Sequence, residues 1–127
     1  MTYAFDPAEG AILVDAELTG PAATVELLLV LDTGATCTMV SEDRLRAAGI
    51  DPSTPTGQAH ATFGGGVATL PMVTVPTLSA LGTRRTDYQV VCHTLPPSAG
   101  VDGVLGLDLF PGRVLTIDFA NNTLDLT

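Results

Sequence analysis

An apolar strand that runs directly into an acidic residue is the feature that most restricts how this chain can fold. Residues 23–31 read ATVELLLVL, where alternating polar and apolar side chains give way to a continuous apolar stretch, as expected for a strand entering a core. Asp32, Thr33 and Gly34 follow at once. A carboxylate at such a place costs several kcal/mol unless it is paired. Asp32 is therefore a candidate functional acid, with Gly34 allowing a sharp backbone turn and Thr33 offering a hydroxyl beside it.

The rest of the sequence predicts short strands separated by turns. Thirteen Gly and nine Pro are spread along the chain, and eighteen Thr with many Val favour β structure. One helix is expected over residues 42–48, capped by Ser41 and ended by Gly49, and residues 105–110 can form a single turn. The other expected strands cover residues 10–18, 58–63, 67–75, 87–95, 101–105, 113–119 and 123–127. This pattern predicts an all-β fold, a closed barrel or sandwich with one or two short helices.

Size and charge restrict the classes of function. The 127 residues suit a single domain, residues 1–127, and 46% of them are hydrophobic, which is enough for a packed core. The formal charge is −9, with five Arg and no Lys, so neither nucleic acid nor an anionic membrane is an expected partner. No signal peptide is recognisable, and Cys37 and Cys92 are expected to be free thiols. A cytoplasmic protein is predicted.

The tripeptide Asp32-Thr33-Gly34 is not decisive alone, because chance produces it in roughly one such chain in ten. Asp32 can also be interpreted as a turn acid that accepts backbone N–H groups. The glycines at 64–66 can belong to a plain surface hairpin, and residues 104–106 to an ordinary core strand. Asp102 and Asp108 are interpreted as turn or capping acids. His60 and His93 are interpreted as non-catalytic.

Three features in a fixed order make the chain resemble the retropepsin family of aspartic proteases. They are the apolar strand with Asp32-Thr33-Gly34-Ala35, a glycine-tipped hairpin at 64–66 that looks like the flap, and Val104-Leu105-Gly106 followed by a helix-like turn. Retroviral members often carry Asp where this chain has Thr36. The helix after residue 41 looks closer to bacterial and cellular relatives. The resemblance implies a closed acid-protease barrel.

The resemblance also implies an activity. Aspartic proteolysis uses two carboxylates that share one proton, yet this chain has a single Asp-Thr-Gly, so the second Asp32 is expected from another copy in a homodimer. The implied enzyme is an aspartic endopeptidase acting on a peptide or protein, without metal or cofactor. The implied catalytic residues are Asp32, Thr33 and Gly34. The implied substrate-binding residues are Ala35, Phe63, Gly64, Gly65, Gly66, Val104, Leu105 and Gly106.

Two other functions stay open. A non-catalytic member of the same fold would bind peptides or mediate dimerisation, and an unrelated small β-barrel would carry a ligand. The intact Asp32 motif favours the enzyme over the binding domain, because a pure binder has no need for an acid pair. Solution mass separates the enzyme from a monomeric carrier, and a peptidase assay separates it from a binder.

Overall fold

A closed barrel forms the body of the protein in the computed structural model, which describes residues 1–63, 66–95 and 99–127. Seven strands form one sheet, in which β2 also pairs with β6, so six of them close into a ring and β5 extends from β6. In sheet order the strands are β2 (Leu13–Thr19), β3 (Thr24–Leu31), β8 (Gly103–Leu105), β4 (Met39–Ser41), β7 (Thr83–His93), β6 (Gly66–Ala80) and β5 (Gly57–Phe63). The predicted all-β closed barrel with one short α-helix is confirmed.

Alternate side chains of the barrel strands form the core. On β2, Val14, Ala16 and Leu18 are buried, whereas Asp15 and Glu17 between them are exposed. The same alternation on β3 buries residues 27, 29 and 31, as the predicted strand requires. A fully buried leucine contributes about 1.5–3 kcal/mol relative to an exposed one. The strand that leads to Asp32 is therefore firmly anchored.

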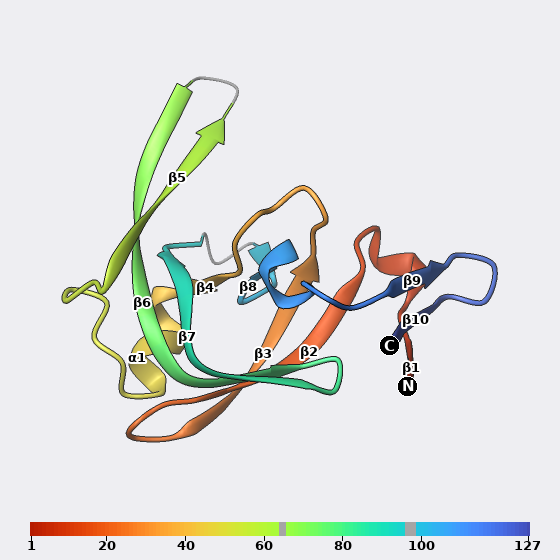
Figure 1. The fold of residues 1–127 in the computed structure, drawn as a ribbon, viewed down its shortest axis with the longest axis horizontal. Coiled ribbons are helices and arrows are strands. Elements are labelled where there is room, and N and C mark those ends of the chain that lie inside the picture. The colour runs from red at the N-terminus through yellow and green to blue at the C-terminus, as the bar shows by residue number, and fades with distance from the viewer. Residues whose placement is uncertain (64–65, 96–98) are drawn as a thin grey trace.

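A hairpin formed by β5 and the first part of β6 projects beyond the barrel (Figure 1). It was predicted from its two extended segments, and its described residues are paired from Gly57↔Met72 to Phe63↔Gly66. The tip residues Gly64 and Gly65 lie outside the described part of the chain. β6 is longer than predicted and continues past Val75 through Pro76 to Ala80, in the barrel wall.

A second hairpin, between β6 and β7, was not predicted. Its two-residue turn is Leu81 and Gly82, whose φ angles of 50° and 72° are those of a turn that matches the twist of paired strands. Leu81 is an unusual residue for this backbone conformation, but its side chain is 6% exposed and belongs to the core. Burial therefore outweighs the local preference at this position.

The α-helix α1 (Glu42–Ala47), the only one among the described residues, lies where it was predicted. Ser41 occupies the N-cap position, although its side chain accepts no capping bond, and Gly49 ends the segment with a φ of 88°. Leu45 packs into the core. No described helix has both the length and the apolar composition that crossing a bilayer requires.

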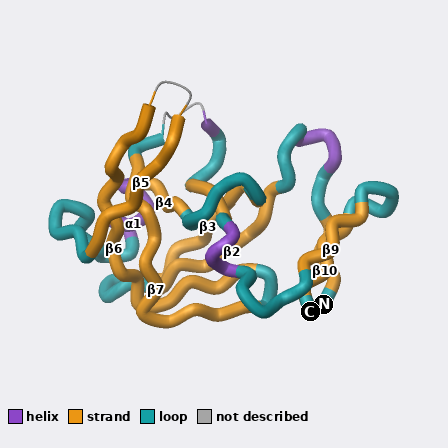
Figure 2. Tube along the Cα trace, turned by 45° about the horizontal axis from the view of Figure 1, so that its top comes forward, coloured by secondary structure: helices purple, strands orange, loops and turns teal. Residues whose placement is uncertain are grey.

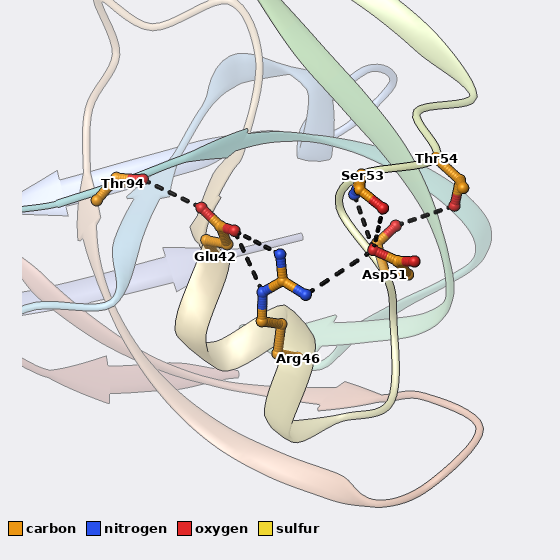
Figure 3. A network of polar contacts seen from close by, with 6 residues as sticks. All are labelled: Glu42, Arg46, Asp51, Ser53, Thr54 and Thr94. Atoms are coloured by element: carbon orange, nitrogen blue, oxygen red, sulfur yellow. Dashed lines mark hydrogen bonds and ion pairs between the residues drawn. The ribbon is translucent and has the colours of Figure 1, made fainter.

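A network of polar side chains connects α1 to its two neighbours (Figure 3). Arg46 donates to Glu42 one turn earlier at 2.7 Å and lies 3.8 Å from Asp51 in the loop that leads to β5. Thr94, just after β7, donates to the other oxygen of Glu42. The bonds from Arg46 and then Thr94 hold the pKa of Glu42 below its ordinary value. The network ties the loop before the projecting hairpin to the helix.

A three-stranded sheet stands beside the barrel and contains both ends of the described chain (Figure 2). Its strands, in order, are β1 (Thr2–Ala4), β10 (Thr123–Leu126) and β9 (Leu115–Asp118). The hairpin of β9 and β10 was predicted, whereas β1 was not. Leu124 and Leu126 of the middle strand belong to the main core, which joins this sheet to the barrel.

Candidate active site

Asp32 stands at the end of β3, where the chain leaves the barrel wall. Its backbone N–H donates to the carbonyl of Leu105 at 3.1 Å, which extends the pairing of β3 with β8 by one residue. Its carboxylate Oδ1 accepts the N–H of Gly34 at 2.8 Å, and the Ala35 N–H donates to the Asp32 carbonyl at 3.1 Å. Two bonds thus close a tight turn directly after the acid.

The Asp32 carboxylate is exposed in the single chain, as are Thr33 and Gly34. The strand before it is buried, but the acid itself is not, so its charge carries little of the desolvation cost inferred from the sequence. The turn-acid interpretation describes one of its oxygens correctly, because Oδ1 accepts a backbone N–H. We call residues 32–38 the Asp32 loop.

The Asp32 loop crosses the end of a neighbouring strand. β8 lies between β3 and β4, parallel to β3 and antiparallel to β4. The loop joins β3 to β4 and must therefore pass over Leu105, the last residue of β8, and Gly106, which follows it. Leu107, just beyond, donates its N–H to the Ala35 carbonyl at 2.8 Å. The crossing brings two predicted motifs, residues 32–35 and residues 104–106, into direct contact.

Gly106 is required at this crossing for space. A Cβ there would lie 2.6 Å from the carbonyl carbon of Cys37 and 3.0 Å from the carbonyl oxygen of Ala35. Its φ of −95° is available to any residue, so conformational freedom is not the reason for glycine. Gly34 is restricted in a similar way, because a Cβ there would lie 3.1 Å from Asp32 Oδ1.

Hydrogen bonds between Thr38 and Asp108 lock the crossing. Thr38 was not identified from the sequence, and Asp108 was interpreted as a local capping acid. Thr38 is fully buried and donates its hydroxyl to Asp108 Oδ1 at 2.7 Å and its N–H to both carboxylate oxygens at 3.0 and 3.1 Å. The same hydroxyl accepts the Gly106 N–H at 3.1 Å. No local pattern marks this pair, because its members are 70 residues apart.

Tyr88 and Arg85 of β7 lie near the Thr38–Asp108 lock. Burial, followed by the nearby Asp108 carboxylate, raises the pKa of the Tyr88 phenol. The Tyr88 hydroxyl and the Arg85 Nε are buried and make no hydrogen bond within the described residues. Arg85 also donates from its Nη2 to the Leu109 carbonyl at 2.8 Å, one residue after Asp108. Both side chains therefore support η3 (Leu107–Leu109), the turn that carries Asp108.

The remaining predicted site residues fall into two groups. Ala35 and Val104 are half-buried beside the Asp32 turn, whereas the Leu105 side chain is fully buried and only its carbonyl faces Asp32. Gly66 is exposed on the projecting hairpin, where it pairs with the backbone of Phe63. The side chain of Phe63 and the whole of Gly64 and Gly65 lie outside the described part of the structure.

A family model described as aspartyl protease matches residues 14–109. The chain belongs to the aspartyl protease family. The matched span runs from β2 to η3, so it covers the barrel, the Asp32 loop and the Thr38–Asp108 lock. The strands β9 and β10 of the terminal sheet lie beyond it.

One solved structure shows the same fold over the whole length of this family member. A retropepsin-like aspartic protease from Rickettsia conorii superposes with a TM-score of 0.69, covering 100% of this chain and 97% of the other, at 15% sequence identity. No protein with curated function matches the sequence. The retropepsin-like resemblance inferred from three short motifs is thus confirmed for family and fold.

Proposed function

We propose that this aspartyl protease family member is an aspartic endopeptidase that is active as a homodimer. Each chain contributes one Asp32 to a shared pair of carboxylates. The observation that carries the proposal is the presentation of Asp32: a firmly anchored strand ends in an exposed carboxylate, on a loop held at both ends. An acid that served only its own turn would not need the lock between Thr38 and Asp108.

The proposed chemistry uses the two carboxylates in different roles. One is ionised and takes a proton from a water molecule as that water attacks the scissile carbonyl. The other is protonated and donates a hydrogen bond to the carbonyl oxygen. Two carboxylates about 3 Å apart cannot both ionise, so the pair keeps one proton over the working pH range. In a dimer, Thr33 and Gly34 of each chain would lie beside this pair.

The proposed substrate is an extended peptide that lies between the Asp32 loop and the projecting hairpin of β5 and β6. Ala35 in the Asp32 loop and Val104, which pairs with Val30 of β3, are half-buried apolar residues. Phe63 and Gly64–Gly66 would close over the peptide as a flap. Leu105 would contribute to the site through its carbonyl, which accepts the Asp32 N–H. Gly106 would contribute by allowing the Asp32 loop to cross closely over it. We also propose a cytoplasmic location, with which the free thiols Cys37 and Cys92 are consistent.

The sharing of one site between two chains can be tested by mixing. Wild-type protein is incubated with increasing amounts of Asp32→Asn until subunits exchange, and cleavage of a peptide library is followed. At equal amounts, about a quarter of the dimers carry two wild-type chains if exchange is random. Activity per wild-type chain should therefore fall by about half. In a monomeric enzyme it would stay constant, which would exclude the shared pair.

The same assay addresses the alternative of a non-catalytic domain that binds peptides or mediates dimerisation. Such a protein would form dimers and leave every peptide intact. Binding of a peptide that carries a hydroxyl in place of the scissile carbonyl, a mimic of the tetrahedral intermediate, gives a second readout. The proposed enzyme should bind it more tightly than the matching substrate peptide, and Asp32→Asn should remove the difference.

A further inference from the structure

We propose that Asp108 is a positioning residue for the Asp32 loop: it fixes the far end of the loop through Thr38 and so sets the orientation of the Asp32 carboxylate. This inference rests on the proposed function. Asp108 itself faces away from the exposed side of the turn, because both its oxygens accept bonds from the buried Thr38. It therefore acts on the reaction only through the loop.

The loop is held at Asp32, Ala35 and Thr38, and Asp108 binds the last of these residues. At its start, the Asp32 N–H is bound to the Leu105 carbonyl. At its end, Thr38 is bound by Asp108, and the Thr38 hydroxyl passes the connection on to the Gly106 N–H. A threonine hydroxyl has a single proton to donate. Because that proton goes to Asp108, the hydroxyl oxygen is oriented to accept from Gly106, and the two bonds form one continuous chain.

The surroundings of Asp108 favour a fixed position for its carboxylate. Thr38 binds the carboxylate, the Tyr88 phenol lies near it, and Arg85 holds the carbonyl of Leu109 on the same turn. Burial and the Asp108 carboxylate raise the pKa of the Tyr88 phenol, so this neighbour stays protonated. A carboxylate fixed by charge-assisted bonds is a stiffer anchor than a neutral acceptor.

Asp102 offers a matched control on the other side of β8. Its carboxylate also binds a neighbouring strand, accepting the Leu28 N–H of β3 at 2.8 Å, and it accepts the Arg44 Nε–H at 3.1 Å. Asp102 precedes β8 and Asp108 follows it, so both acids join a segment near β8 to a backbone N–H about 70 residues earlier. Only Asp108 is connected to the Asp32 loop.

The experiment compares Asp108→Leu and Thr38→Val with Asp102→Leu, in the full-length chain. Leucine is close to aspartate in length and accepts no hydrogen bond, and valine removes only the threonine hydroxyl. Thr38→Ser keeps the hydroxyl and is the conservative rescue variant. Urea unfolding identifies variants of equal stability, and sedimentation identifies equal dimerisation. If Asp108→Leu fails to fold, Thr38→Val carries the comparison, because its backbone N–H still binds Asp108.

The kinetic expectation is a loss in kcat with little change in KM. A catalytic group displaced by about 1 Å can lose on the order of a hundredfold in rate. Asp108→Leu and Thr38→Val should therefore lower kcat by about ten- to a hundredfold, while Thr38→Ser stays within about threefold of wild type. Asp102→Leu should lose stability without this loss in kcat. Equal kcat in the Asp102 and Asp108 variants would overturn the positioning role.

A second readout does not depend on activity. Hydrogen exchange is measured at the amides of Gly34, Ala35 and Leu107, whose bonds lie within the loop or join it to η3. The Thr38 amide is left out because Asp108→Leu removes its acceptor directly. Faster exchange at these three amides in Asp108→Leu, and not in Asp102→Leu, supports the inference. Unchanged exchange at these amides would overturn the positioning role of Asp108. A wild-type protein that cleaves no peptide would refute the proposed function and leave the exchange result valid.

Discussion

Gly106 and Cys37 are in backbone contact: the position of a Cβ on Gly106 lies 2.6 Å from the Cys37 carbonyl carbon. The contact occurs where the Asp32 loop crosses the end of β8, and the facing atoms are main-chain atoms that cannot rotate away. Both segments must move if any side chain is placed between them. The motifs at residues 32–35 and 104–106 can therefore lie this close together only because Gly106 has no side chain.

Gly106→Ala should destabilise the protein by about 1–3 kcal/mol, the usual cost of overpacking. Urea unfolding measures the change in the free energy of unfolding. Gly57→Ala is the matched control, because its Cβ would meet only the flexible Gln89 amide group at 3.4 Å. That variant should change stability by no more than about 0.5 kcal/mol. Equal effects of the two substitutions would show that the crossing tolerates a methyl group.

Asp32→Asn should abolish peptide cleavage and leave the fold intact. The amide cannot take a proton from the attacking water, and loss of a general base costs about a hundred- to ten-thousandfold in rate. Because Asp32 is exposed and the amide oxygen can still accept the Gly34 N–H, the unfolding midpoint should stay close to wild type. Peptidase activity near that of wild type in the purified variant would refute the role assigned to Asp32.

Dimerisation should tighten as salt is added. Each chain carries a formal charge of −9, so two copies repel one another at low ionic strength. From about 0.1 M to about 1 M salt, the screening length falls from about 10 Å to about 3 Å. Sedimentation at several protein and salt concentrations measures the dissociation constant. A protein that stays monomeric at every condition would contradict the homodimer.

Tyr88→Phe should reduce the loss of stability at alkaline pH. The unfolded chain ionises this phenol near its ordinary pKa of 10.0, whereas burial and Asp108 raise the pKa in the folded state. The stability that Tyr88 contributes is thus complete below pH 10 and decreases as pH rises toward the folded pKa. Phenylalanine has no proton to lose. Urea unfolding between pH 8 and pH 11 should give a shallower decline for the variant, and parallel declines would contradict this account.

The barrel could be predicted from the sequence because its strands carry their own signals. The alternation on β2 and β3, the helix around Leu45 and the hairpin of β9 and β10 are all local patterns. Asp32 was found for the same reason, since its strand, turn and glycine are contiguous. Strand ends were less predictable. β6 continues through Pro76 to Ala80, and the β2 residues that pair with this extension are about 60 residues away in the sequence.

The parts that sequence missed depend on contacts between distant residues. β1 is three residues long and pairs with residues 123–125, so the neighbouring sequence contains no pattern that predicts a strand. In the sequence, Thr38 cannot be distinguished from the other threonines of this β-rich chain. In the structure, its hydroxyl makes the bonds that hold the loop crossing. Asp102 and Asp108 were interpreted as turn acids, and each binds a backbone N–H that is adjacent in the fold but about 70 residues away in the sequence.

The pairing of Thr2 with Asp125 sets an order of events during protein synthesis. The first strand emerges from the ribosome with no partner for its backbone groups and waits for a segment more than a hundred residues behind it. The backbone pairing of the ring from β2 to β8 lies within residues 13–105, but the core inside that ring also includes Leu124 and Leu126 of β10. The arrival of β10 would therefore complete the packing of the barrel and give β1 its partner.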